Sequence, residues 1–168
     1  MARWSFNFTT FLPIAAGDAA ATLTSGSYMA IQGASATQRI DIWEVFMGGQ
    51  ATSSAPTIMV VARDSVIGVT LSSTSGAKTA ALDPATAALA AAPVPFTIAT
   101  TPPQRSTTLG LLNLSFNAFG GIVRWAAPDE HGALRMLGNT ASLGEISLSA
   151  FTGGTPGIMG AHILFEPL

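Results

Sequence analysis

The stretch RIDIWEVFMGGQ, Arg39 to Gln50, decides the fold class of this chain. Apolar residues at alternate positions are typical of a β-strand with one buried face. Here apolar residues occupy both sets of alternate positions, with Asp41 and Glu44 among them. The pattern therefore predicts a strand whose second face is covered too, either by a neighbouring subunit or by another part of the same chain.

Short stretches of strand character recur along the sequence between clusters of Gly, Pro, Ser and Asp. They lie near residues 3–9, 20–24, 27–32, 38–47, 57–63, 66–72, 95–100, 107–116, 121–126, 145–151 and 158–166. Many short strands at this spacing are typical of a sandwich or a barrel. We predict an all-β fold, a jelly roll or β-sandwich, in which residues 1–168 form a single domain with at most one short helix.

The alternation is clearest in EISLSAF and LGLLNLSFNAF. In the first, Ile146, Leu148 and Ala150 are expected to face one way, and Ser147, Ser149 and Phe151 the other. In the second, Leu112, Leu114 and Phe116 alternate with Asn113 and Ser115. One buried and one polar face on each strand is the pattern of a sandwich.

Three segments carry separate expectations. The stretch DPATAALAAA, residues 83–92, is the helix candidate, because Asp83 is a good cap and Pro84 suits the first helical position. Residues 73–95 as a whole are rich in Ala, Ser and Thr and are expected to form a surface excursion. Residues 1–12 are read either as an N-terminal arm that lies over a neighbouring subunit or as an ordinary core strand.

The composition restricts the possible partners. Charged residues make up 10% of the chain, against about 25% in average soluble proteins. The net charge is −2 and the arginines are scattered singly, whereas nucleic-acid binding needs clustered Lys and Arg. Cysteine is absent, and no stretch reaches the roughly 20 apolar residues of a membrane span. We therefore expect neither nucleic acid nor a membrane as a partner.

The sequence contains no catalytic signature, and we expect no enzyme activity, cofactor or metal. SGAKT lacks the glycine spacing of a phosphate-binding loop. Asp129, Glu130 and His131 are explained by a turn after Pro128. His162 lies in an apolar strand, where a hydrogen-bonded interior or interface histidine is the expected role.

Asp41 and Glu44 are the candidate carboxylate pair of this sequence. Three residues apart on a regular strand, they would point to opposite faces, which argues against joint acid–base chemistry. Pairing of an outward carboxylate with Arg39 or Arg63 is the simpler expectation.

Several segments follow one another between about residues 38 and 166. They are RIDIWEVFMGGQATSSAPTIMVVARDS, an Ala/Thr-rich excursion, GGIVRWAAPDE, NTASLGEISLSAF and HILFEP. Their order resembles that of the small β-sandwich structural proteins of tailed bacteriophages, nearest to capsid decoration or cement proteins. Proteins of that kind are non-enzymatic, sit on the outside of the head, often as trimers at threefold or quasi-threefold positions, and clamp neighbouring capsomers. The resemblance brings no catalytic residues with it.

The expected function is that of a virion protein, made in the host bacterial cytoplasm, which binds the phage major capsid protein and stabilises the capsid as a homo-oligomer, expected to be a trimer. The alternative is a receptor- or glycan-binding tail module. Neutral, low-charge surfaces suit permanent contact between subunits. The expected interface residues are Trp4, Phe6, Phe8, Trp43, Val45 and Met47.

Overall fold

The computed structural model describes residues 2–14, 22–72, 78–89, 92–129, 131–139, 143–153 and 156–168. Within these ranges the chain is an all-β sandwich without a helix, which confirms the predicted fold class. The strands are β1 (Trp4–Phe11), β2 (Met29–Gln32), β3 (Arg39–Gln50), β4 (Pro56–Val66), β5 (Val69–Ser72), β6 (Lys78–Ala81), β7 (Val94–Phe96), β8 (Ile98–Thr101), β9 (Gln104–Asn117), β10 (Phe119–Ala126), β11 (Leu134–Leu137), β12 (Glu145–Gly153) and β13 (Met159–Pro167).

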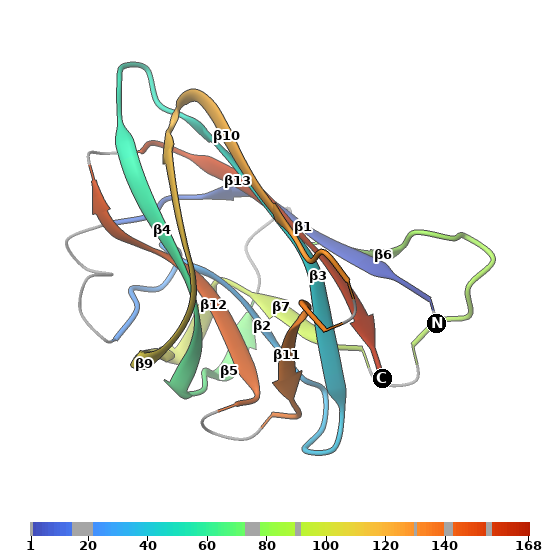
Figure 1. Cartoon of the computed structure of the whole chain (residues 1–168). Coiled ribbons are helices and arrows are strands. Elements are labelled where there is room, and N and C mark those ends of the chain that lie inside the picture. The colour runs from blue at the N-terminus through green and yellow to red at the C-terminus, as the bar shows by residue number, and fades with distance from the viewer. Residues whose placement is uncertain are drawn as a thin grey trace.

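Two antiparallel sheets form the sandwich (Figure 1). Sheet A has the order β10-β3-β13-β1-β6, with β11 pairing to the first part of β3. Sheet B has the order β7-β2-β12-β4-β9, and β5 pairs with β8 in a separate two-stranded ribbon. The hairpin of β9 and β10 passes from sheet B to sheet A at one side of the sandwich.

The main core lies between the two sheets and follows the predicted alternation. Ile146, Leu148 and Ala150 of β12 belong to this core. Ser147 and Ser149 are on the opposite face of the same strand, where they bond to other buried polar groups. The polar face of β12 is therefore buried as well, a point that alternation alone does not reveal.

A β-bulge in β3 explains why apolar residues fall at both sets of alternate positions. Ile42 pairs with Phe165 of β13 and Glu44 pairs with Leu164, so Trp43 is the extra residue on β3. A bulge of one residue reverses the alternation beyond it. Consequently Ile40, Ile42, Val45 and Met47 all point into the main core.

The bulge also puts Asp41 and Glu44 on the same face of sheet A, its outer face. The expectation that they point to opposite faces was wrong because it assumed a regular strand. The outer face of β3 thus carries these two carboxylates together with the half-buried rings of Trp43 and Phe46.

Residues 4–11 form a core strand and not an arm. β1 lies between β13 and β6 in sheet A. Phe6 is 0% exposed and Phe8 is 2% exposed. The ring of Phe6 packs edge-on against Phe8 and tilted against Phe165, with centroids 5.8 and 6.2 Å apart.

The excursion at residues 73–95 supplies an edge strand to each sheet. β6 pairs with β1 in sheet A and β7 pairs with β2 in sheet B. In the helix candidate, Asp83 caps a turn, with its Oδ1 accepting from the Ala85 N–H at 2.9 Å and its carbonyl from Thr86. Residues 83–89 form no helix, while residues 73–77 and 90–91 are outside the described ranges.

A second, smaller core lies on the other face of sheet B, under the β5–β8 ribbon. It consists of Leu23, Tyr28, Ala30, Phe96 and Ala99, with Leu71 packed against them. β2 and residues 145–150 of β12 in sheet B are buried on both faces.

Candidate functional site

The outer face of sheet A carries a row of paired charged groups. Asp41 accepts two hydrogen bonds from Arg135 of β11, to its Oδ1 from Nε and to its Oδ2 from Nη2, both 2.6 Å. This two-point pairing fixes both side chains, and it raises the pKa of Arg135. The expectation of an outward carboxylate paired with arginine was correct in kind, but the partner is neither Arg39 nor Arg63.

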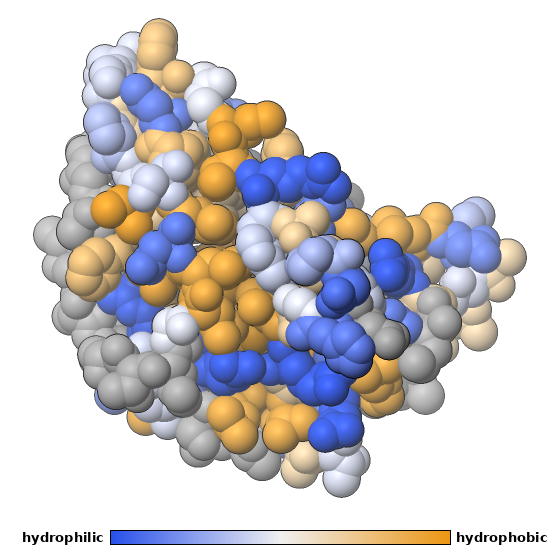
Figure 2. Space-filling view, viewed as in Figure 1, coloured by the Kyte–Doolittle hydropathy of each residue, from blue (hydrophilic) through white to orange (hydrophobic). Residues whose placement is uncertain are grey.

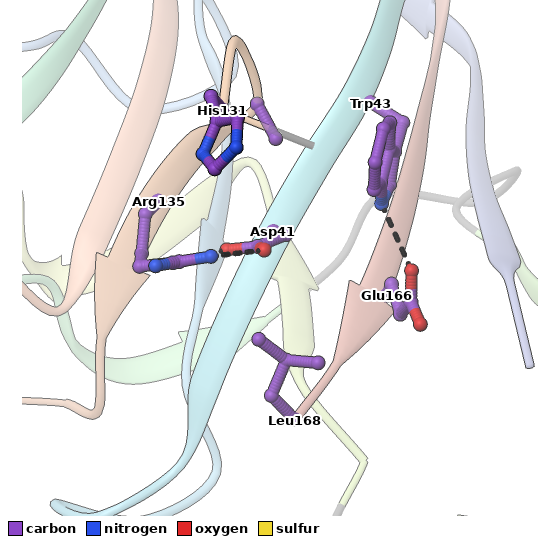
Figure 3. Close-up of a pocket in the computed structure, with 7 residues that line it drawn as sticks. Asp41, Trp43, His131, Arg135, Glu166 and Leu168 are labelled. Carbon is purple, nitrogen blue, oxygen red and sulfur yellow. Dashed lines mark hydrogen bonds and ion pairs between the residues drawn. The ribbon is translucent and has the colours of Figure 1, made fainter. Parts of the chain in front are cut away.

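A cavity of about 460 Å³ opens on this face between β3, β11 and β13. Its lining residues are Asp41, Trp43, His131, Ala133, Arg135, Glu166 and Leu168. Figure 3 shows the Asp41–Arg135 pair on one side and the indole of Trp43 with Glu166 on the other. Asp41 and Arg135 thus pair with each other across one wall, and Glu166 accepts a hydrogen bond from Trp43 at the other.

Trp43, the extra residue of the β3 bulge, is half-buried and lines one wall of this cavity. Its Nε1 donates to Glu166 Oε2 at 3.1 Å. The guanidinium of Arg3 lies over the ring, 4.1 Å from the centroid, and its Nε is 4.0 Å from Glu166 Oε2. Arg3 and Glu166 therefore hold the indole in place.

A second polar cluster surrounds Glu44. Its Oε2 accepts from Arg124 Nη2 at 2.6 Å, and its Oε1 lies 2.9 Å from His162 Nε2. The His162 ring stacks on Phe46 with centroids 5.2 Å apart. The hydrogen bond from Arg124 lowers the pKa of Glu44, burial opposes this effect, and the bond with His162 lowers the pKa further.

The side of the sandwich formed by β9 and β10 exposes apolar side chains. Five of these side chains pack against the main core and are only partly buried: Leu112, Leu114 and Phe116 of β9, and Val123 and Trp125 of β10. Figure 2 shows hydrophobic side chains gathered in the middle of this face, over the region between β9 and β10 in Figure 1.

The hairpin itself adds to this apolar surface. Phe119 is 57% exposed and Ile122 is 66% exposed. Apart from an isolated bridge between Thr22 and Gln104 at the start of β9, the described pairings join β9 to β4 and β10 to β3, so the rest of each strand presents a free edge. A free strand edge beside exposed apolar side chains is suited to contact with another chain.

Sheet B holds a buried acidic pair that sequence reasoning missed. Asp64 of β4 and Glu145 of β12 are both 0% exposed. Burial and the neighbouring carboxyl of Glu145 raise the pKa of Asp64 well above its usual value, and burial raises the pKa of Glu145. A signal existed in GEISLSA, where Glu145 shares a face with Ser147 and Ser149, but a buried polar face was not anticipated.

The expected interface residues lie mostly in the core. Trp4, Phe6, Phe8, Val45 and Met47 belong to the main core, between 0% and 9% exposed. They are covered by their own chain, because β1 is a paired strand and the β3 bulge turns Val45 and Met47 inward. Trp43 is the exception, since it lines the cavity on the outer face.

The turn and histidine expectations have clear outcomes. Asp129 Oδ1 accepts from the backbone N–H groups of His131 and Gly132 at 2.9 and 3.0 Å, which confirms a turn. Glu130 lies outside the described residues. His162 is hydrogen-bonded, as expected, although on the outer face of the sheet.

No protein-family model matches the chain, and searches of curated proteins and of solved structures give no match either. Among the described residues, no group of three or more His, Cys, Asp or Glu side chains is arranged to hold a metal ion. The same part of the chain has no helix of the length and apolarity needed to cross a membrane.

Proposed function

We propose that this chain is a non-enzymatic structural protein that binds and stabilises a larger protein shell as a homo-oligomer. The shell proposed is a bacteriophage capsid, with the major capsid protein as partner and the virion as location. This proposal extends the resemblance of residues 38–166 to capsid decoration proteins. A trimer is the oligomer proposed.

The observation that supports the proposal is the apolar side of the sandwich at β9 and β10. Phe119 and Ile122 are more than half exposed there, next to partly buried Leu114, Phe116 and Trp125. Burial of apolar surface is worth roughly 25 cal/mol per Å². A surface of this kind gains free energy when a second copy covers it, and the free edges of β9 and β10 add hydrogen-bonding groups.

Light scattering tests the oligomer. The wild-type protein is expected to show three times its chain mass of 17.1 kDa at micromolar concentration. Replacing Phe119 and Ile122 together by Ser is expected to shift the population towards the monomer, with the circular dichroism spectrum unchanged. Leu82→Ser is the matched control, because Leu82 is 55% exposed on another part of the surface. A wild-type mass of 17.1 kDa would count against the proposal.

Co-sedimentation tests the shell. Purified protein is mixed with empty heads assembled from the major capsid protein of the same virus and pelleted through a density gradient. Saturable co-sedimentation that the Phe119/Ile122 double variant weakens and Leu82→Ser preserves supports the proposal. An oligomer that fails to sediment with heads would refute the capsid role while leaving the oligomer in place.

The cavity beside Trp43 favours a second candidate, a receptor- or glycan-binding tail module. Paired carboxylates and guanidinium groups beside an indole offer donors and acceptors to a neutral, hydroxyl-rich ligand. Arg3 already occupies one face of the indole. Titration with oligosaccharides while the tryptophan fluorescence is followed, with Asp41→Asn as comparison, distinguishes this candidate: an unchanged signal over a broad saccharide panel argues against it.

A further inference from the structure

The acidic pair of sheet B lies beside the turn between β4 and β5 and joins several elements. Ser147 Oγ donates to Asp64 Oδ1 at 2.6 Å. Glu145 Oε2 accepts from Gln32 Nε2 at 2.8 Å and from the Gly68 N–H at 3.0 Å. Gly68 belongs to the turn between β4 and β5. One oxygen of each carboxyl is therefore satisfied by a protein donor, and Glu145 ties this turn to β12 and β2.

The other oxygen of each carboxyl has no donor. Asp64 Oδ2 and Glu145 Oε1 are buried without a hydrogen-bond partner among the described donors. Ile146 of β12 pairs with Arg63 of β4 in antiparallel register, so the next position on each strand, Glu145 and Asp64, brings the two buried carboxyls side by side. Ionised carboxylates only accept hydrogen bonds, so a contact between two of them is favourable only when one carries a proton.

The charge balance of this buried region points to the same state. Arg105 of β9 is paired in register with Asp64, is 6% exposed, and donates from Nη1 to Ser149 Oγ at 2.7 Å. Two ionised carboxyls and one guanidinium would leave a net charge of −1 in the interior. A single proton on the pair brings the sum to zero, which avoids the cost of an uncompensated buried charge.

We propose that Asp64 and Glu145 share one proton in the folded protein, and that this proton locks the β4–β5 turn and the β5–β8 ribbon onto sheet B. The groups that face the pair are Gln32 from β2, Ser147 from β12, Arg105 from β9 and the Gly68 amide from the turn. Of these, Arg105 is the charged group. A hard cation in place of the proton fits less well, because such ions take six or more oxygen ligands.

The shared proton holds the turn more strongly in acid than in base. Burial and the neighbouring carboxyl hold the pKa of Asp64 above its unfolded value, so the folded state binds more protons than the unfolded state between the two values. The stability from the shared proton is fully present below the unfolded pKa, and it is lost as the pH rises through the folded pKa. At high pH two charges face each other, and repulsion loosens the turn that carries Gly68.

Carbon-13 NMR of the side-chain carboxyls tests the shared proton directly. In wild-type protein one buried carboxyl is expected to remain protonated at a pH at which exposed Asp and Glu side chains are already ionised. Asp64→Asn and Glu145→Gln each supply an amide N–H in place of the proton and are expected to abolish this titration. Asp83→Asn, at an exposed turn, is the control and leaves it unchanged. Ordinary titration of both wild-type carboxyls would overturn the proposal.

Amide hydrogen exchange tests the lock. As the pH rises, protection of the Gly68 amide, corrected for the intrinsic rate, is expected to fall by tenfold or more in wild-type protein, but to stay constant in Asp64→Asn. The same pH dependence in both proteins would refute the link between proton and turn. Millimolar calcium or magnesium chloride is added in a parallel experiment. If either ion stabilises the wild type but not Asp64→Asn at a pH where both carboxyls are ionised, the pair holds a cation and the proposal fails.

Discussion

Replacement of Phe6 by Ala tests whether β1 is part of the core. Phe6 is 0% exposed, and its ring contacts those of Phe8 and Phe165. Truncating a fully buried Phe costs about 3–5 kcal/mol, which includes the lost transfer free energy and the cavity left behind. The free energy of unfolding of a domain is about 5–15 kcal/mol, so we expect the variant to remain folded but with much reduced stability.

Urea unfolding followed by circular dichroism measures this loss. With an m-value of about 2 kcal/mol per M, a loss of about 4 kcal/mol lowers the unfolding midpoint by about 2 M. The protein concentration is kept constant, because association would add to the apparent stability. Phe151→Ala is the matched control: its side chain is 46% exposed, and we expect a loss below about 1 kcal/mol. If Phe6→Ala costs no more than this control, the placement of β1 in the core is wrong.

Two further predictions concern buried charged groups. The double variant Asp64→Asn/Glu145→Gln is expected to be about 3 kcal/mol less stable than either single variant at pH 7, because it leaves the charge of Arg105 buried without compensation. Thermal melts of the wild type, the two single variants and the double variant check this. Equal stability of the double and single variants would show that charge balance is unimportant in this region. Glu44→Gln is expected to remove a stabilisation that exists above the unfolded pKa of about 4.5 and is lost as the pH falls through the lowered folded pKa. The difference in melting temperature between wild type and Glu44→Gln should therefore be largest near neutral pH and vanish in acid. A difference that stays constant with pH would contradict the stabilising role of the ionised Glu44.

Local patterns were sufficient for the fold class and for several strand faces. Strand-like alternation in EISLSAF placed Ile146 and Leu148 in the main core correctly, and the turn at Asp129 followed from residues that favour turns for backbone reasons. These features depend on neighbours two to four positions apart in the chain. The helix predicted at residues 83–92 was wrong, although its local signal at Asp83 is real. Asp83 does form a cap, but residues 83–89 continue as a turn and a loop.

The candidate site depended on pairings between distant parts of the chain. Arg135 meets Asp41, and Arg124 meets Glu44, because β11 and β10 both pair with β3. No local pattern specifies which arginine meets which carboxylate. Strand order sets the partners, and it results from the packing of the whole sandwich.

The sequence by itself determined that the chain is all-β, since period-two alternation and turn residues act over a few positions. Only the tertiary structure decided where the alternation breaks. The single extra residue at Trp43 turns Val45 and Met47 inward and brings Glu44 to the face of Asp41. The tertiary structure also decided that Asp64 and Glu145 are buried together, because a polar strand face is exposed or covered according to what packs on it. Bulges and covering layers arise from contacts across the fold, and their free energy is not encoded in any short segment.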